Sequence, residues 1–302
     1  MNSRKTKLDA LAVACLVGCC FLWGLNQVAA KVALAEVPPL TQAALRSLGG
    51  AALVWGFAAW RGMALFSRDG TLRGGLLAGA LFAAEFGCIF LGLTFTTASR
   101  MVVFIYLSPF VVALGMPFIA RSERLSWPQM LGLVAAFAGM AWAFAEGFTR
   151  PAAGPLQWLG DALGVAAGVL WGATTLVIRA SRLGMASPEK TLLYQLGTSG
   201  VLLALAALLE SEGLGAAPLS MLAIASLLFQ VVVVSFASYL LWFWLMRHYP
   251  ATKISAFTLL TPVFGLLLGA LLLAEPITAR LLVALVGVSA GIFLVNRPGT
   301  TT

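Results

Sequence analysis

The chain has few charges, a single histidine and four cysteines, and these shortages exclude several classes of protein. Only 10% of its 302 residues are charged, against about a quarter in soluble domains. We find no HExxH, GxSxG or P-loop pattern, no paired acids in the middle of an apolar run, and no position for base chemistry at His248. The sequence therefore predicts no enzyme, no cofactor and no use of ATP.

The four cysteines, Cys15, Cys19, Cys20 and Cys88, all fall inside apolar runs. Cysteine in such runs is usually a small buried side chain. Because the first three have no histidine or carboxylate nearby, their spacing predicts neither zinc nor any other metal, and we expect no disulfide.

Apolar residues dominate what is present. They make up 61% of the chain, and the mean hydropathy is +0.97. A helix needs roughly 20 apolar residues to cross about 30 Å of hydrocarbon. Ten runs meet this length, at approximately residues 10–34, 39–60, 73–94, 98–119, 127–145, 157–180, 190–209, 219–245, 252–273 and 279–296. We therefore predict an all-α integral membrane protein with ten transmembrane helices.

The net charge of +8 is distributed by side of the membrane. With ten spans, 14 of the 19 lysines and arginines fall on the side that holds both termini, whereas Lys31, Arg100, Arg150 and Arg280 fall on the other side and Arg46 lies inside a span. This is the positive-inside bias. It predicts a multi-pass protein of the inner, cytoplasmic membrane with both termini cytoplasmic, and it leaves no reason to expect a nucleic-acid partner.

Three motifs recur in order along the chain. "LWG" occurs at residues 22–24 and 170–172, "ASRMVVFIYLSP" at 98–109 resembles "ATKISAFTLLTP" at 251–262, and "ERLS" at 123–126 resembles "EPIT" at 275–278. The offsets are 148, 153 and 152 residues. This predicts two five-helix halves, 1–146 and 157–302, joined by a loop at 147–156. An odd number of helices inverts the second half, an arrangement typical of alternating-access transporters.

The sequence resembles the EamA-type families of the drug/metabolite transporter superfamily. The resemblance rests on features in both halves: Trp23–Gly24, Arg46 in "LRSLGG", Pro109, Pro262, Glu123 and Glu275. Within that superfamily it looks most like the YddG-type aromatic amino-acid exporters. The resemblance implies a secondary transporter that exports small neutral amphipathic metabolites, with aromatic amino acids as the best candidates.

Two other functions remain open from the sequence. One is a carrier of another metabolite class: other amino acids, drugs, or phosphorylated or nucleotide sugars. Phosphorylated solutes call for several basic groups near the middle of the membrane, and only Arg46 comes close. The other is a membrane receptor or assembly subunit, which would not require an inverted repeat. The partners predicted are a small-molecule solute and the lipid bilayer, and the sequence identifies no oligomer.

Polar and aromatic residues inside the apolar runs are the candidates for a solute cavity. Trp23, Asn26 and Gln27 are spaced i, i+3 and i+4 and share one helix face, and Trp171 and Thr174 repeat the arrangement in the second half. Packing between helices is the competing interpretation. The remaining candidates for the cavity wall are Glu85, Phe104, Tyr106, Ser235, Tyr239 and Trp242.

Two further pairs of residues have predicted roles. Pro109 and Pro262, at matching places in the halves, would act either as hinges or as static kinks. Glu85 and Arg46 both lie deep in predicted spans. They would form a structural ion pair, or Glu85 would bind a substrate ammonium group or carry a coupled proton.

Overall fold

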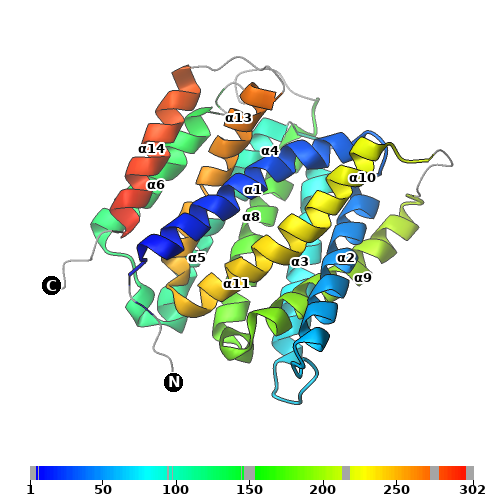
Figure 1. Cartoon of the computed structure of the whole chain (residues 1–302). Helices are drawn as coiled ribbons and strands as arrows, with labels where there is room; N and C mark the ends of the chain where they lie inside the picture. The colour runs from blue at the N-terminus through cyan, green and yellow to red at the C-terminus, as the bar shows by residue number, and fades with distance from the viewer. Residues whose placement is uncertain are drawn as a thin grey trace.

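The computed structural model describes residues 5, 7–93, 95–96, 98–143, 145, 154–212, 218–272 and 279–296, and every regular element in this part of the chain is helical (Figure 1). The first half contains α1 (Ala10–Leu34), α2 (Pro39–Trp60), α3 (Leu72–Leu93), α4 (Ala98–Ile105), α5 (Ser108–Ile119), the short η1 (Arg121–Glu123) and α6 (Trp127–Ala143). The second half contains α8 (Gln157–Ala180), η2 (Arg182–Met185), α9 (Pro188–Leu209), α10 (Met221–Leu228), the π-helix η3 (Phe229–Ser238), α11 (Tyr239–His248), α12 (Ala251–Phe257), α13 (Leu260–Leu272) and α14 (Ala279–Asn296).

Local signals explain where the helices begin. Asp9 caps α1 by accepting from the backbone N–H of Ala12, and Ser187 and Ser220 cap α9 and α10 in the same way. Proline opens α2 and α9, where the missing N–H would have no helical partner anyway. The predicted limits 10–34, 39–60, 157–180 and 279–296 agree with α1, α2, α8 and α14.

Two predicted helices are each divided in two. Tyr106 and Leu107 separate α4 from α5 within the predicted 98–119, and Thr258 and Leu259 separate α12 from α13 within the predicted 252–273. Each break comes shortly before the proline of the matching motif. Pro109 and Pro262 therefore lie in the first turn of a new helix and do not bend a continuous one. Proline is tolerated in a first turn because its missing N–H would have no helical partner there.

Within the described residues, six helical segments are long and apolar enough to cross a membrane by length and composition. They are Ala10–Leu34, Leu72–Leu93, Arg100–Ile119, Gln157–Ala180, Pro188–Leu209 and Met221–His248. The last of these joins α10, η3 and α11 end to end. The other long helices are shorter or more polar; α2, for example, buries Gln42, Arg46 and Ser47.

Small residues allow the helices to pack closely. The most extensive contacts pair α6 with α14 and α3 with α8, and α9 lies against both α2 and α3 (Figure 1). A side chain added at Gly139 would come within 3.2 Å of the Cα of Gly287. One added at Gly24 would come within 2.9 Å of the backbone of Gly265. Such contacts are typical of helices packed inside membranes.

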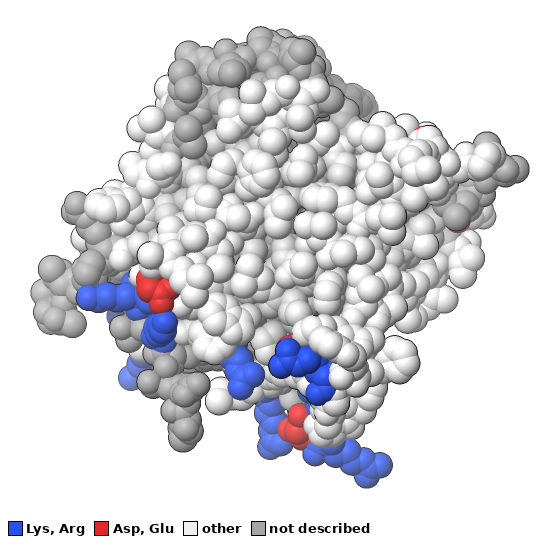
Figure 2. Space-filling view, in the orientation of Figure 1, with Lys and Arg blue, Asp and Glu red and all other residues white. Residues whose placement is uncertain are grey.

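The basic residues gather at one end of the helix bundle. Figure 2 shows Lys and Arg side chains concentrated at the end where α1 begins and α14 finishes in Figure 1. We call this the basic end and define it by Lys5, Arg179, Arg182 and Lys190. There the backbone N–H of Lys5 donates to the carbonyl of His248 at 3.0 Å. The loop between α2 and α3 is tied to α9, because the Lys190 ammonium lies 2.6 Å from the carboxylate of Asp69.

Candidate functional site

Arg46 of α2 lies in the interior of the bundle and joins three other elements. Its Nη2 donates to the Tyr239 hydroxyl at 2.6 Å, and its Nε donates to the Ser235 hydroxyl at 3.3 Å. The guanidinium carbon lies 5.1 Å from the ring centroid of Phe86 on α3, a cation–π distance. The residue Arg46 is only 7% exposed. A buried arginine is thus satisfied without any carboxylate.

The predicted ion pair between Arg46 and Glu85 does not form in this structure. Both residues are described, yet no ion pair within 4.0 Å joins them. Glu85 of α3 is 6% exposed, and its Oε2 atom is buried without a hydrogen-bond partner. Arg46 takes hydroxyl and aromatic partners instead because η3 and α11 bring Ser235 and Tyr239 against α2.

Aromatic side chains surround the same place. The indole N–H of Trp23 on α1 donates to the Ser238 hydroxyl at 2.8 Å, and that hydroxyl donates to the carbonyl of Val234. The Trp23 ring meets Tyr239 edge-on at 6.0 Å and Trp242 at 5.2 Å. Phe82 lies 6.4 Å from Tyr239 and 4.9 Å from Phe86. We call Trp23, Phe82, Phe86, Tyr239 and Trp242 the aromatic cluster.

A second group of predicted residues lies where α4 and its break before α5 pack against α8. Tyr106 meets Trp171 of α8 edge-on at 5.5 Å. Phe104 packs close to α8, because a side chain added at Gly164 would come within 3.0 Å of the Phe104 Cβ. The Thr174 hydroxyl donates to the carbonyl of Leu170 in its own helix. In this conformation the Thr174 hydroxyl is therefore hydrogen-bonded within its own helix.

Two predicted cavity residues on α1 stand apart from the aromatic cluster. Asn26 is half-buried, and its Oδ1 atom has no hydrogen-bond partner. Gln27 is exposed. The shared face predicted for Trp23, Asn26 and Gln27 thus carries only one residue into the cluster, Trp23.

The sequence did not point to Ser238, Phe82 or Phe86. Ser238 is the last residue of the π-helix η3, whose wider turns change which side chains face α1 and α2. π-helical turns inside α-helices are frequent at functional sites. The available signal was spacing, because Ser238 lies three residues after Ser235 and four before Trp242. Phe82 and Phe86 form an i, i+4 pair with Glu85 beside it, a pattern that apolar runs contain by chance as well.

A buried ion pair closes the basic end. The carboxylate of Glu123 pairs with the Arg179 guanidinium, and their side chains are 6% and 2% exposed. The same carboxylate accepts from the backbone N–H of Ala251 at 2.5 Å, and Arg179 donates to the carbonyl of Met246 at 3.3 Å. This network holds together η1, α8, α11 and the start of α12.

Nearby, Asp9 accepts from Lys5, from the backbone N–H of Ala12 and from the Tyr249 hydroxyl. The hydrogen bond from the Lys5 ammonium, followed by those from Ala12 and Tyr249, lowers the pKa of the Asp9 carboxyl to about 2. The hydrogen bond from Lys190 likewise holds the pKa of Asp69 below its usual value.

Contacts also close the opposite end. Arg100 of α4 lies 2.5 Å from Asp161 of α8, and the Thr96 hydroxyl donates to the same carboxylate at 2.7 Å. Between α1 and α2, Glu36 accepts from Ser220 at the start of α10. The site residues therefore lie between two sets of polar contacts, one at each end of the bundle. The side chains of Lys31 and of the predicted motif residue Glu275 lie outside the described part of the chain.

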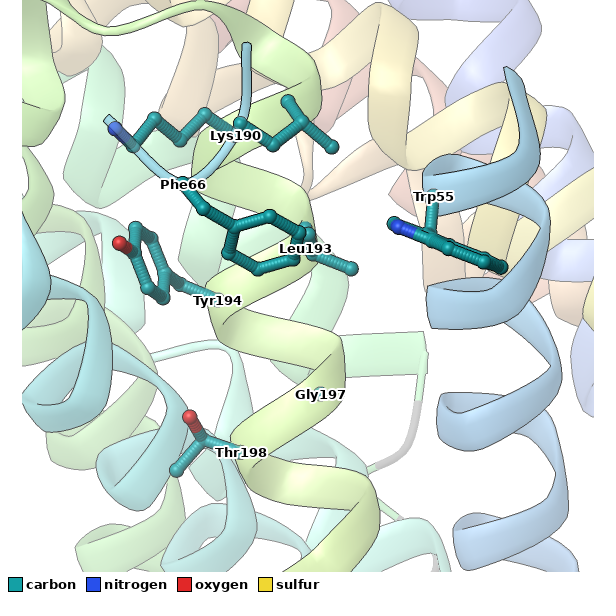
Figure 3. A pocket seen from close by; sticks show the side chains of 8 residues that line it. Trp55, Phe66, Lys190, Leu193, Tyr194, Gly197 and Thr198 are labelled. Carbon is teal, nitrogen blue, oxygen red and sulfur yellow. The ribbon is translucent and has the colours of Figure 1, made fainter. Parts of the chain in front are cut away.

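A surface hollow of about 410 Å³ lies away from this site. Figure 3 shows Trp55 projecting from α2 toward Phe66 and toward the face of α9 that carries Leu193 and Gly197. The ammonium of Lys190 at its edge is held by Asp69 and Ser67. None of the predicted cavity residues lines this hollow, so it is separate from the site around Arg46.

Long apolar helices packed into one bundle, with polar and aromatic residues at its centre, are typical of polytopic membrane proteins. The chain belongs to the EamA-like transporter family, whose model matches residues 10–145 and again residues 158–297. It is a multi-pass membrane transporter, and the members of this family are transporters rather than enzymes.

Individual relatives agree with this assignment. The uncharacterized transporter YvbV of Bacillus subtilis is 29% identical over 295 residues, covering 97% of this chain and 92% of YvbV. The probable amino-acid metabolite efflux pump of Salmonella typhimurium is 29% identical over 302 residues, covering 97% and 95%. A solved crystal structure at 20% identity covers 95% of this chain and 98% of its own, with a TM-score of 0.79.

Proposed function

We propose that the protein is an inner-membrane secondary transporter that exports small neutral amphipathic metabolites, with aromatic amino acids as the best candidates. The observation that carries the proposal is the buried Arg46, which contacts Tyr239 and Phe86 of the aromatic cluster. Ring faces suit a flat, partly apolar solute, and the neighbouring hydroxyl groups supply orientation. A relative named as a probable amino-acid metabolite efflux pump supports the amino-acid class.

The transport cycle proposed is alternating access by two inverted halves, 1–146 and 157–302, linked by 147–156. The ten spans proposed are formed by α1, α2, α3, α4–α5, α6, α8, α9, α10–η3–α11, α12–α13 and α14. The helix contacts support this pairing, because exchanging the halves maps contacts onto contacts. The contact of α3 with α8 corresponds to that of α1 with α10 and η3, and the contact of α5 with α8 corresponds to that of α1 with α13. The family model also matches once in each half.

The breaks before Pro109 and Pro262 would serve as hinges. They occur at matching places in the two halves, between α4 and α5 and between α12 and α13. A helix interrupted at these points can change the angle between its segments with few hydrogen bonds to break. The glycines of the two "LWG" motifs pack against these segments, Gly172 on Val111 and Gly24 on Phe264.

The basic end would face the cytoplasm, and both termini would lie there. The cluster of Lys5, Arg179, Arg182 and Lys190 supports this orientation through the positive-inside rule. In this conformation, the buried pair of Glu123 and Arg179 would close the cytoplasmic side. Export requires that this side open to load the solute.

Counterflow in liposomes tests the proposal. Purified protein is reconstituted into vesicles loaded with an unlabelled solute, and uptake of the labelled solute is followed for a panel of amino acids and sugar phosphates. We expect tryptophan, phenylalanine or tyrosine to exchange fastest. Exchange of sugar phosphates instead, or of no member of the panel, contradicts the proposed solute class.

A matched pair of tryptophan variants tests the location of the site. Trp242 is buried in the aromatic cluster, whereas Trp60 ends α2 and is 81% exposed. Removing one ring contact weakens binding of an aromatic solute by roughly 3- to 10-fold. We therefore expect Trp242→Leu to raise the half-saturating solute concentration by that factor. Trp60→Leu should leave it unchanged. Equal effects of the two variants contradict this location.

A further inference from the structure

The carboxylate of Glu85 is isolated in the membrane interior. It lies 13 residues after the start of α3, roughly 20 Å along the helix at 1.5 Å per residue. The side chain is buried, Oε2 has no hydrogen-bond partner, and no ion pair involves Glu85 among the described residues. Buried polar groups are nearly always partnered. A carboxylate left without a partner in such a place is stable only as the neutral acid.

The cation that acts on Glu85 is engaged elsewhere. The charge of Arg46 acts on Glu85 without a hydrogen bond between them. The Nη2 and Nε atoms of Arg46 donate instead to Tyr239 and Ser235. In this conformation Arg46 thereby ties α2 to η3 and α11. An ionised Glu85 would compete for this guanidinium, because a pair of opposite charges is stronger than hydrogen bonds from one charged group to neutral hydroxyl groups.

Two other ionisable groups lie within reach of the charge of Glu85. They are Cys88 on α3 itself and Tyr106 between α4 and α5. On α8 and α9, which also pack against α3, the ionisable side chains lie toward the helix ends. Among these, Asp161 is paired with Arg100, Arg179 with Glu123 and Lys190 with Asp69. Arg46 is therefore the partner that the arrangement offers to an ionised Glu85.

We propose that Glu85 carries the proton that couples solute export to a proton gradient, and that its ionisation draws Arg46 away from Tyr239 and Ser235. This rests on the proposed transport function. The protonated acid belongs to the conformation seen here. When the site opens to water, the acid releases its proton to that solution, Arg46 pairs with the carboxylate, and α2 is freed from η3 and α11. Protonation from the opposite side restores the present contacts.

A chemical probe tests the protonation of Glu85 without any solute. Dicyclohexylcarbodiimide enters bilayers and modifies protonated carboxyl groups in apolar surroundings. With the full chain in liposomes, mass spectrometry should find the adduct on Glu85, decreasing as the pH is raised, and none on the exposed Glu36. A Glu85 that stays unmodified at every pH, or whose modification does not vary with pH, overturns the proposal.

A transport experiment separates coupling from transport itself. Each coupled proton supports about tenfold solute accumulation per pH unit of gradient, since one unit is a factor of ten in proton activity. We expect wild type and Glu210→Gln, at an exposed carboxylate just after α9, to show this accumulation. Glu85→Gln should lose it and the pH dependence, yet still exchange solute across the membrane when no gradient is present.

The outcomes are distinguishable. If wild type exchanges no tested solute, the proposed function fails, and the carbodiimide result alone decides the role of Glu85. If Glu85→Gln still accumulates solute under a pH gradient as wild type does, the coupling proposal fails. Glu85→Asp keeps an ionisable group and should retain pH-dependent accumulation. Gel filtration of both variants controls for loss of folding.

Discussion

The carboxylate of Glu123 is buried at the basic end and depends on its partners. It faces Arg179 and the first N–H groups of α12. Breaking a buried pair by removing one charge leaves the other uncompensated, which typically costs about 3–5 kcal/mol. The cost of breaking this pair therefore comes from its burial as well as from its charges, because exposed ion pairs contribute about 1 kcal/mol or less to stability.

Glu123→Gln is expected to lower the free energy of unfolding by about 3 kcal/mol or more. Thermal unfolding of the detergent-solubilised protein, read by tryptophan fluorescence, measures the change. Glu210→Gln provides the control, because Glu210 lies exposed just after α9. A Glu123→Gln protein that melts with wild type would contradict the buried pair.

Asp9 gives the basic end a dependence on acid. Its pKa of about 2 lies below the ordinary 3.8, so its contacts stabilise the folded protein fully above about pH 4. This contribution is lost as the pH falls through about 2. Asp9→Asn should remove that part of the acid sensitivity, seen as a flatter plot of melting temperature against pH. An unchanged plot would contradict the assignment.

At the scale of elements, the breaks before Pro109 and Pro262 allow a direct test of the hinges. Alanine at either position permits a continuous helix across the break. We expect Pro109→Ala and Pro262→Ala to slow turnover by about tenfold, equal to about 1.4 kcal/mol on the barrier, with little change in the half-saturating concentration. Counterflow rates measure both quantities.

Pro117 supplies the control for the hinge variants. It lies inside α5 and has no counterpart in the second half. Pro117→Ala should therefore leave turnover unchanged. If it slows transport as much as Pro109→Ala does, helix stiffness in general matters and the matched breaks are not specific hinges.

The contact of α6 with α14 depends on glycine. A Cβ added at Gly132 would lie 2.6 Å from the Cβ of Leu294 and 2.9 Å from the carbonyl oxygen of Gly291, whereas one added at Gly18 on α1 meets nothing within 4 Å. We expect Gly132→Ala to destabilise the protein by about 1–3 kcal/mol and Gly18→Ala to be neutral or slightly stabilising. Thermal unfolding of both variants checks the contrast, and a neutral Gly132→Ala would contradict the packing.

At the scale of the whole molecule, the proposed inverted repeat requires that the two halves insert in opposite directions. If so, reporters fused to the amino and carboxyl ends lie in the same compartment, the cytoplasm. Reporter activity or cysteine labelling in intact cells checks this, with a cysteine placed at exposed Ser211, beyond α9, expected on the outer side. Termini in different compartments would contradict the ten-span scheme.

The sequence by itself determined the helices and the class of protein. Long apolar runs ended by proline, glycine or charge are local features, so the limits of α1, α2, α8 and α14 followed from them. The sequence also singled out Trp23, Tyr239 and Trp242, because aromatic residues deep in a span need a reason to be there. The family resemblance, which the family model bears out, likewise rests on residues that can be read in order.

Only the tertiary structure decided which of these residues meet. Arg46 takes Tyr239 and Ser235 in place of Glu85, because the π-helical η3 sets the register of α11 against α2. The breaks before Pro109 and Pro262, the isolation of Glu85 and the pairing of Glu123 with Arg179 depend in the same way on how separate helices approach. Glu123 and Arg179 are more than 50 positions apart, and Glu85 has no hydrogen-bonded partner at all. Sequence patterns within one helix carry no information about either arrangement.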